Sequence, residues 1–126
     1  MKRCWFGLAL LVTLLAGGLL TSRSMVKIHG DISRTLETAA DAAVREDWNA
    51  VRDSFAGARE EWERWWHFSA AFADHEPMEE IDSLFAQGEA CLKLGEGEAM
   101  GMVCAQLIQR TKAMGDAHTC TWWNLL

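Results

Sequence analysis

Apolar residues recur every three or four positions along most of the chain after residue 25, and this is the spacing of one face of an α-helix. The pattern predicts four helices, over about 26–44, from about 47 to 72, 77–94 and 98–114. The second helix has the longest apolar stripe: Trp48, Val51, Phe55, Ala58, Trp62, Trp65, Ser69 and Phe72. Such regular stripes indicate helices that bury one face against each other.

Short polar or glycine-containing segments separate these helices. Asp47 is a suitable N-cap for the second helix, Pro77 suits the first turn of the third, and Gly95–Glu98 reads as a turn. Gly115 is expected to end the fourth helix. Short connections favour antiparallel neighbours, so we expect a small all-α bundle of about four helices, arranged as two helical hairpins. A faint repeat of an acidic turn at 46–50 and 95–99 resembles tetratricopeptide hairpins.

The N-terminus reads as a membrane segment. Lys2 and Arg3 precede an uncharged apolar stretch over residues 4–20, and Arg23 follows it. Ser22-Arg23-Ser24 is a poor cleavage site, so an uncleaved signal-anchor helix is favoured over a removed signal peptide. We therefore expect a transmembrane segment at 1–24 and a helical domain at 25–126. The basic flank predicts a cytoplasmic N-terminus and an extracytoplasmic domain in the cell membrane.

Composition limits the classes of partner and of secondary structure. The net charge of −6 and the dispersed basic residues argue against a nucleic-acid ligand, which requires a basic surface. Half of the residues are hydrophobic, and alanine, leucine, glutamate and arginine are frequent, which favours helices over strands.

The order of short motifs carries a resemblance to a family. A basic N-terminus and one apolar span are followed by an Asp-Trp turn, a tryptophan-rich helix, an Asp-His-Glu run and a closing Asn-Leu-Leu. In this order they resemble the domain-of-unknown-function family numbered 4363, small single-span proteins of Gram-positive bacteria. The matching residues are Asp47-Trp48, Trp62, Asp74-His75-Glu76, Ile81 and Asn124-Leu125-Leu126. The resemblance implies a location and an architecture, but the family has no assigned activity.

Two clusters are candidate interaction or corner residues. Trp62 and Trp65 fall on the apolar stripe and Trp66 on its edge, so we interpret the cluster mainly as core, with Trp66 the best candidate for an exposed contact. Asp74, His75 and Glu76 precede Pro77, where carboxylates favour the positive end of a helix. We interpret these three residues as a helix-start corner, with His75 held by a hydrogen bond.

Candidate chemistry is sparse. The four cysteines form no CxxC pair, and buried free thiols are favoured over a Cys91–Cys104 disulfide, which the hairpin geometry leaves open. Nucleotide-binding, hydrolase and zinc-protease motifs are absent. Two triplets have a spacing that could place three metal ligands on one helix face. They are His75, Glu79, Asp82 and Glu60, Glu63, His67, but the second triplet lies off the apolar stripe. We therefore expect no catalytic, cofactor or metal residues.

The sequence favours a membrane-tethered, non-enzymatic helical protein that contacts a protein partner at the cell envelope. The alternative is a small-ligand or metal-binding bundle that uses the region of Trp62, Trp66 and His75.

Overall fold

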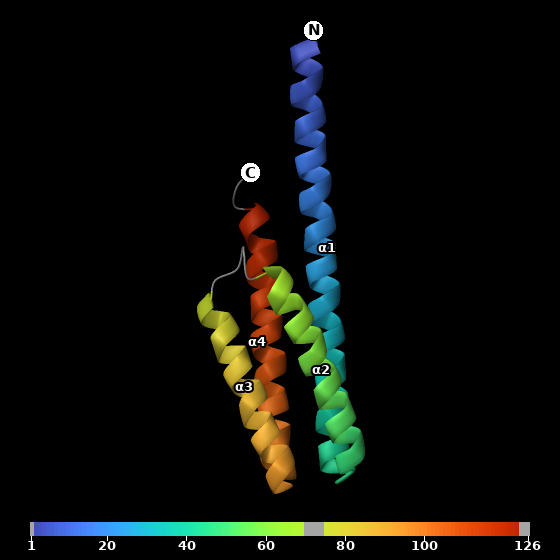
Figure 1. The fold of residues 1–126 in the computed structure, drawn as a ribbon, viewed down its shortest axis with the longest axis vertical. Coiled ribbons are helices and arrows are strands. Elements are labelled where there is room, and N and C mark those ends of the chain that lie inside the picture. Colours follow the sequence, from blue (N-terminus) through green and yellow to red (C-terminus); the bar gives the residue numbers. More distant parts are fainter. Residues whose placement is uncertain (1, 70–74, 124–126) are drawn as a thin grey trace.

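The structure is a computed structural model that describes residues 2–69 and 75–123. These residues form four α-helices: α1 (Lys2–Val44), α2 (Trp48–Ser69), α3 (His75–Leu94) and α4 (Gly97–Trp123) (Figure 1). The described part of the chain contains helices and turns and no strand. The predicted all-α class is therefore confirmed.

Helix α1 joins two segments that the sequence analysis treated separately. The expected membrane segment and the expected first bundle helix form one helix without a break at residue 24. Within the residues that the structure describes, no helix is both long and apolar enough to cross a membrane, so the predicted transmembrane helix is not supported. The uncharged stretch 4–20 has 17 residues and spans only about 26 Å. Arg23 and Lys27 follow it soon afterwards.

The four helices run up and down and form two hairpins, as Figure 1 shows. Helix α1 packs against both α2 and α4, and α3 packs against α4, whereas the contact between α2 and α3 is the smallest of the four. The N-terminal half of α1 projects beyond the other three helices (Figure 1). The core therefore lies around the second half of α1.

The core consists of the apolar stripes that the sequence predicts. The stripe positions of α2 from Val51 to Ser69 are all buried, and Trp48 at its start is half-buried. In α3 the inward line is buried from Met78 to Gly88. The largest fully buried side chains are Trp62, Phe55, Phe85, Ile32 and Leu36. Within the bundle, each helix is held mainly by burial of one apolar face, as helical spacing requires.

The first turn closes as expected, with one unusual residue. Asp47 is the N-cap of α2, and its Oδ1 accepts the backbone N–H of Ala50 at 3.3 Å. Glu46 has φ +57° and ends α1 in the left-handed conformation that glycine favours. The N–H of Asp47 donates to the carbonyl of Ala42 at 3.0 Å, which completes a Schellman cap. Gly95, at φ +69°, holds the matching position after α3.

Two predicted helix boundaries are wrong. Helix α3 begins at His75 rather than Pro77. A proline is tolerated there because the first N–H groups of a helix have no partner within it. Helix α4 continues through Gly115 to Trp123, because tertiary packing outweighs the weak helix propensity of glycine. A Cβ at Gly115 would lie 3.3 Å from Cδ2 of His29, so α1 and α4 pack closely at this point.

Candidate functional site

The projecting half of α1 is an exposed apolar surface. Ten large apolar side chains in it are each more than half exposed: Trp5, Phe6, Leu8, Leu10, Leu11, Val12, Leu14, Leu15, Leu19 and Leu20. Successive residues of an α-helix are about 100° apart, so these side chains point to every side of the helix. A surface of this kind needs an apolar environment all round it, which a single partner helix does not provide.

The tryptophan cluster at the end of α2 is mainly core. The exposed fraction is 1% for Trp62 and 3% for Trp65, whereas Trp66 is half-buried. The rings of Trp62 and Trp65 are 5.0 Å apart, and Trp66 meets Trp62 edge-on at 6.3 Å. The indole N–H groups of Trp62 and Trp65 are buried and have no hydrogen-bond partner among the described residues. Both rings therefore contribute through packing.

Sequence reasoning missed a buried histidine beside this cluster. His29 is 4% exposed, and its ring meets Trp65 edge-on at 5.3 Å. The signal for it was present, because His29 lies three residues before the stripe residue Ile32. Because histidine is polar, this position was not counted as part of the apolar stripe. His29 thus connects α1 to the tryptophans of α2 and packs against Gly115 of α4.

The predicted corner residues are only partly described. Asp74 lies outside the described residues, whereas His75 and Glu76 are exposed in the first turn of α3. The hydrogen bond predicted to hold His75 is not observed in the described part of the chain. No ring contact there joins His75 to Trp62 or Trp66. Of the residues of the alternative ligand site, the structure therefore brings Trp62 and Trp66 together, but neither ring contacts that of His75.

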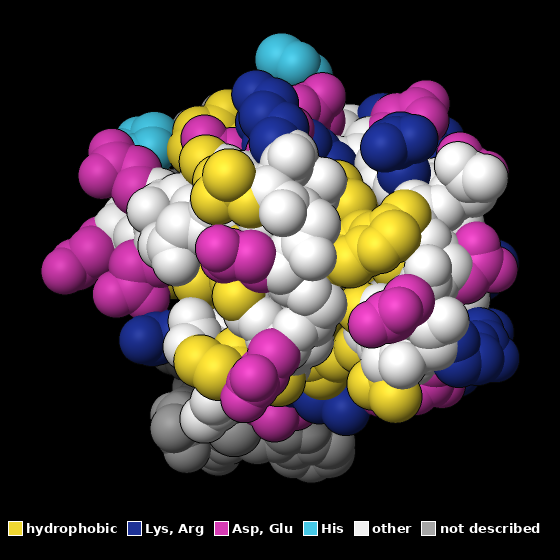
Figure 2. All heavy atoms as spheres, turned by 90° about the horizontal axis from the view of Figure 1, so that it is seen from below, with side chains coloured by type: hydrophobic (Ala, Val, Ile, Leu, Met, Phe, Trp, Pro, Cys, Tyr) yellow, Lys and Arg dark blue, Asp and Glu magenta, His cyan; other side chains and the backbone are white. Residues whose placement is uncertain are grey.

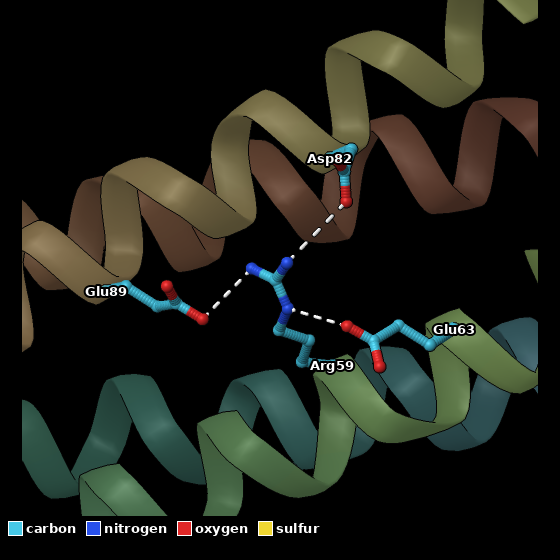
Figure 3. A network of polar contacts seen from close by, with 4 residues as sticks. All are labelled: Arg59, Glu63, Asp82 and Glu89. Atoms are coloured by element: carbon cyan, nitrogen blue, oxygen red, sulfur yellow. Dashed lines mark hydrogen bonds and ion pairs between the residues drawn. The ribbon is translucent and has the colours of Figure 1, made fainter.

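Arg59 of α2 pairs with three carboxylates, one on its own helix and two on α3 (Figure 3). Its Nε is 3.0 Å from Glu63 on the same helix, its Nη1 is 3.0 Å from Glu89, and its Nη2 is 3.9 Å from Asp82. The guanidinium carbon also lies 5.9 Å from the ring centre of Phe85. The hydrogen bond to Glu63 raises the pKa of Arg59 above its usual value, burial opposes this rise, and the charges of Glu89 and Asp82 add to it. The cluster therefore stabilises the smallest helix contact of the bundle.

Sequence reasoning also missed this cluster. The pair Arg59–Glu63 has i,i+4 spacing, and Asp82 and Glu89 are seven residues apart, on one side of the next helix. These spacings alone do not show that the two helices face each other. Beside the cluster is a groove of about 310 Å³, with Phe55 and Leu92 among its lining residues.

A second groove, of about 850 Å³, lies between α3 and α4. Its α3 wall includes Glu76, Glu79, Glu80, Ser83 and Gln87, and its α4 wall includes Gln106, Gln109, Arg110 and Ala113. Both sets recur at helical spacing, so each is one polar helix face. Nη1 of Arg110 is 3.1 Å from Oε2 of Glu80, and this ion pair crosses the groove. Glu76, one of the predicted corner residues, is part of the lining of this groove.

Cys91 and Cys104 are buried free thiols on the two helices of the second hairpin. Burial, with a smaller effect of the neighbouring Cys91, raises the pKa of the Cys104 thiol to about 11. The thiolate is the nucleophile and metal ligand among cysteine forms. Cys104 therefore stays protonated and unreactive at neutral pH. Free thiols, the alternative favoured from the sequence, are confirmed for this pair.

The end of the bundle that lies away from the projecting half of α1 carries both hairpin turns. Figure 2 shows hydrophobic side chains reaching the surface there between acidic and basic ones. Val44 is 83% exposed and Leu94 is 70% exposed, each near the end of a helix. A Cβ at Gly97 would lie 3.2 Å from the carbonyl oxygen of Ala43, so the start of α4 lies against the end of α1. These two exposed apolar side chains belong to different helices, since Val44 ends α1 and Leu94 ends α3.

Comparison with known proteins identifies no relative. The chain matches no protein-family model, no curated protein and no solved structure. The resemblance to the domain-of-unknown-function family 4363 therefore stays a prediction.

Proposed function

We propose that this protein is a non-enzymatic helical module that is tethered to the cell membrane through residues 4–20 and acts through contacts with a protein partner. The observation that carries the proposal is the apolar half of α1. Side chains such as Phe6, at 81% exposed, and Leu20, at 68% exposed, lie on a helix that projects past the bundle. Burying such a surface in lipid is strongly favourable, at about 25 cal/mol per Å² of apolar area.

The charges around this segment support one orientation. Lys2 and Arg3 come before it, and Arg23 and Lys27 follow it. Lys2 and Arg3 directly adjoin the apolar stretch, whereas Arg23 and Lys27 lie three and seven residues beyond it, so the closer basic pair favours a cytoplasmic N-terminus and an extracytoplasmic bundle. A stretch of about 26 Å is slightly shorter than the hydrocarbon core of about 30 Å. Crossing therefore requires local thinning of the bilayer or help from the flanking basic side chains.

The proposed role in protein contacts is supported by polar surfaces on the bundle. The groove between α3 and α4 is lined by charged and amide side chains, and the smaller groove beside Arg59 combines charged side chains with apolar ones such as Phe55 and Leu92; both linings suit recognition more than catalysis. The alternative ligand site is not proposed, because Trp62 is buried and no ring contact or hydrogen bond among the described residues links it to His75.

Membrane fractionation tests the tether. The full chain should stay in the membrane pellet after alkaline carbonate washing, and Leu11→Arg/Leu15→Arg should release it. Val44→Arg/Leu94→Arg is the matched control, because it charges two exposed apolar residues at the opposite end and should remain in the pellet. Wild-type protein in the wash would refute the tether.

Two further measurements test the remaining parts of the proposal. External protease added to protoplasts should remove the bundle, and protection of the bundle would refute the orientation while leaving the tether intact. Crosslinking of the full chain in cells should yield a specific protein adduct. Its absence under conditions that crosslink a known envelope complex would refute the interaction role.

A further inference from the structure

The groove between α3 and α4 is acidic along one wall and rich in amides along the other. Glu76 and Glu79 are exposed in the first two turns of α3 and have no ion pair among the described residues. The groove's cation, Arg110, is paired with Glu80 at 3.1 Å. The lining of the groove therefore carries three carboxylates against one guanidinium, and this excess of negative charge attracts cations.

Carboxylates at the start of a helix are common and do not by themselves make a binding site. Here they face a second wall of different chemistry, formed by Gln106 and Gln109 of α4, with Gln87 further along α3. An amide side chain both donates and accepts hydrogen bonds, as a peptide backbone does. The groove thus offers charge at one end and backbone-like partners along its length.

The spacing of the carboxylates distinguishes between kinds of cation. Within the described residues, no three His, Cys, Asp or Glu side chains converge closely enough to hold a metal ion. The acidic groups instead follow the helix, with one turn of α3, about 5.4 Å, between Glu76 and the pair Glu79–Glu80. Charges arranged in a row suit a linear cation. The volume of about 850 Å³ lies within the range of binding pockets, about 300–1,000 Å³.

We infer that the α3–α4 groove binds an extended basic peptide segment of a partner protein, with lysine or arginine side chains at Glu76 and Glu79 and the peptide backbone along the glutamines. This inference rests on the proposed interaction role and names the partner's chemistry. It does not depend on how residues 4–20 meet the membrane.

Peptide titration of the full chain in a non-ionic detergent tests the inference. The probe is a fluorescent peptide of about ten alternating lysines and alanines, with a glutamate–alanine peptide as the negative control. Binding of the lysine peptide should weaken as salt rises. Glu76→Gln/Glu79→Gln should weaken it roughly two- to thirtyfold at low salt, as expected for the loss of two exposed ion pairs.

A matched control separates the groove from general negative charge. Glu96→Gln/Glu98→Gln removes the same charge at the other end of the same hairpin, from exposed residues around the start of α4, and should leave affinity unchanged. Gln106→Ala/Gln109→Ala should weaken binding of the lysine peptide but not of spermidine, which has no amides.

The possible outcomes are distinct. Equal losses in the two charge variants, or no binding of the lysine peptide, would overturn the inference. Spermidine binding as tightly as the peptide, with no effect of the glutamines, would overturn it in favour of a small polyamine. A crosslinked partner in cells together with failed peptide binding would leave the interaction role in place and refute only the groove.

Discussion

Gly88 of α3 lies against the tip of the Phe55 ring from α2: a Cβ on Gly88 would be 2.3 Å from Cζ of that ring. Phe55 is 1% exposed, and its ring also packs against Phe85 at 5.4 Å. The ring is therefore confined on two sides, by the backbone at Gly88 and by the ring of Phe85. This close approach lets α2 and α3 share an aromatic core although the two helices contact each other little.

The first prediction concerns this contact. Gly88→Ala should destabilise the protein by about 1–3 kcal/mol, because overpacking outweighs the roughly 1 kcal/mol by which alanine favours a helix. Chemical denaturation of the full chain in a non-ionic detergent measures the change. Gly101→Ala is the control: a Cβ there meets nothing within 4 Å, so this variant should be unchanged or stabilised. Equal stability of the two variants would contradict the packing.

The second prediction concerns the tryptophans. Trp62→Ala and Trp65→Ala should each cost about 3–5 kcal/mol, because each removes a large buried ring. Trp66→Ala should cost much less, since Trp66 is only half-buried. The same denaturation measurement applies. Small and equal losses at all three positions would instead indicate an exposed binding face.

The third prediction concerns the Arg59 cluster. Arg59→Met should destabilise the protein by about 1–2 kcal/mol, because Glu63, Asp82 and Glu89 lose their shared cation. The stability of Arg59→Lys should lie between those of the wild type and Arg59→Met, since an ammonium keeps the charge but cannot reproduce the forked geometry of a guanidinium. The difference between wild type and Arg59→Met should shrink in about 1 M salt, where screening is strong. A difference independent of salt would show that the side chain acts through packing alone.

The fourth prediction concerns pH and thiol reactivity. The folded protein holds the Cys104 proton up to a pKa of about 11, above the ordinary value of 9.0. Between these values the folded state binds more protons than the unfolded state, so stability is full below pH 9 and falls as the pH rises toward 11. The loss should approach about 2–3 kcal/mol.

Cys104→Ala supplies the control for that pH dependence, because it should flatten the fall in stability above pH 9. In the folded protein at pH 8, a maleimide should label the buried Cys104 slowly, and unfolding in denaturant at the same pH should make this labelling fast. Mass spectrometry identifies the labelled sites. Rapid labelling of Cys104 without unfolding would show that its thiol is accessible.

Much of the local structure follows from the sequence alone. The three- and four-residue spacing of apolar side chains determines which face of each helix is buried, because that face must leave water for the helix to be stable. Residues such as Phe55, Trp62 and Phe85 were therefore predicted as core and are core. The cap at Asp47 also follows, since a helix start depends on a few neighbouring residues.

Only the tertiary structure decided how the helices meet. Gly115 reads as a helix stop, yet α4 passes through it because a glycine lets His29 of α1 pack close. The sequence alone also does not show the pairing of Arg59 with Glu89 or the α3–α4 groove, since both join residues that are distant in sequence. Periodicity defines a face of one helix, but which faces meet depends on the packing of all four helices.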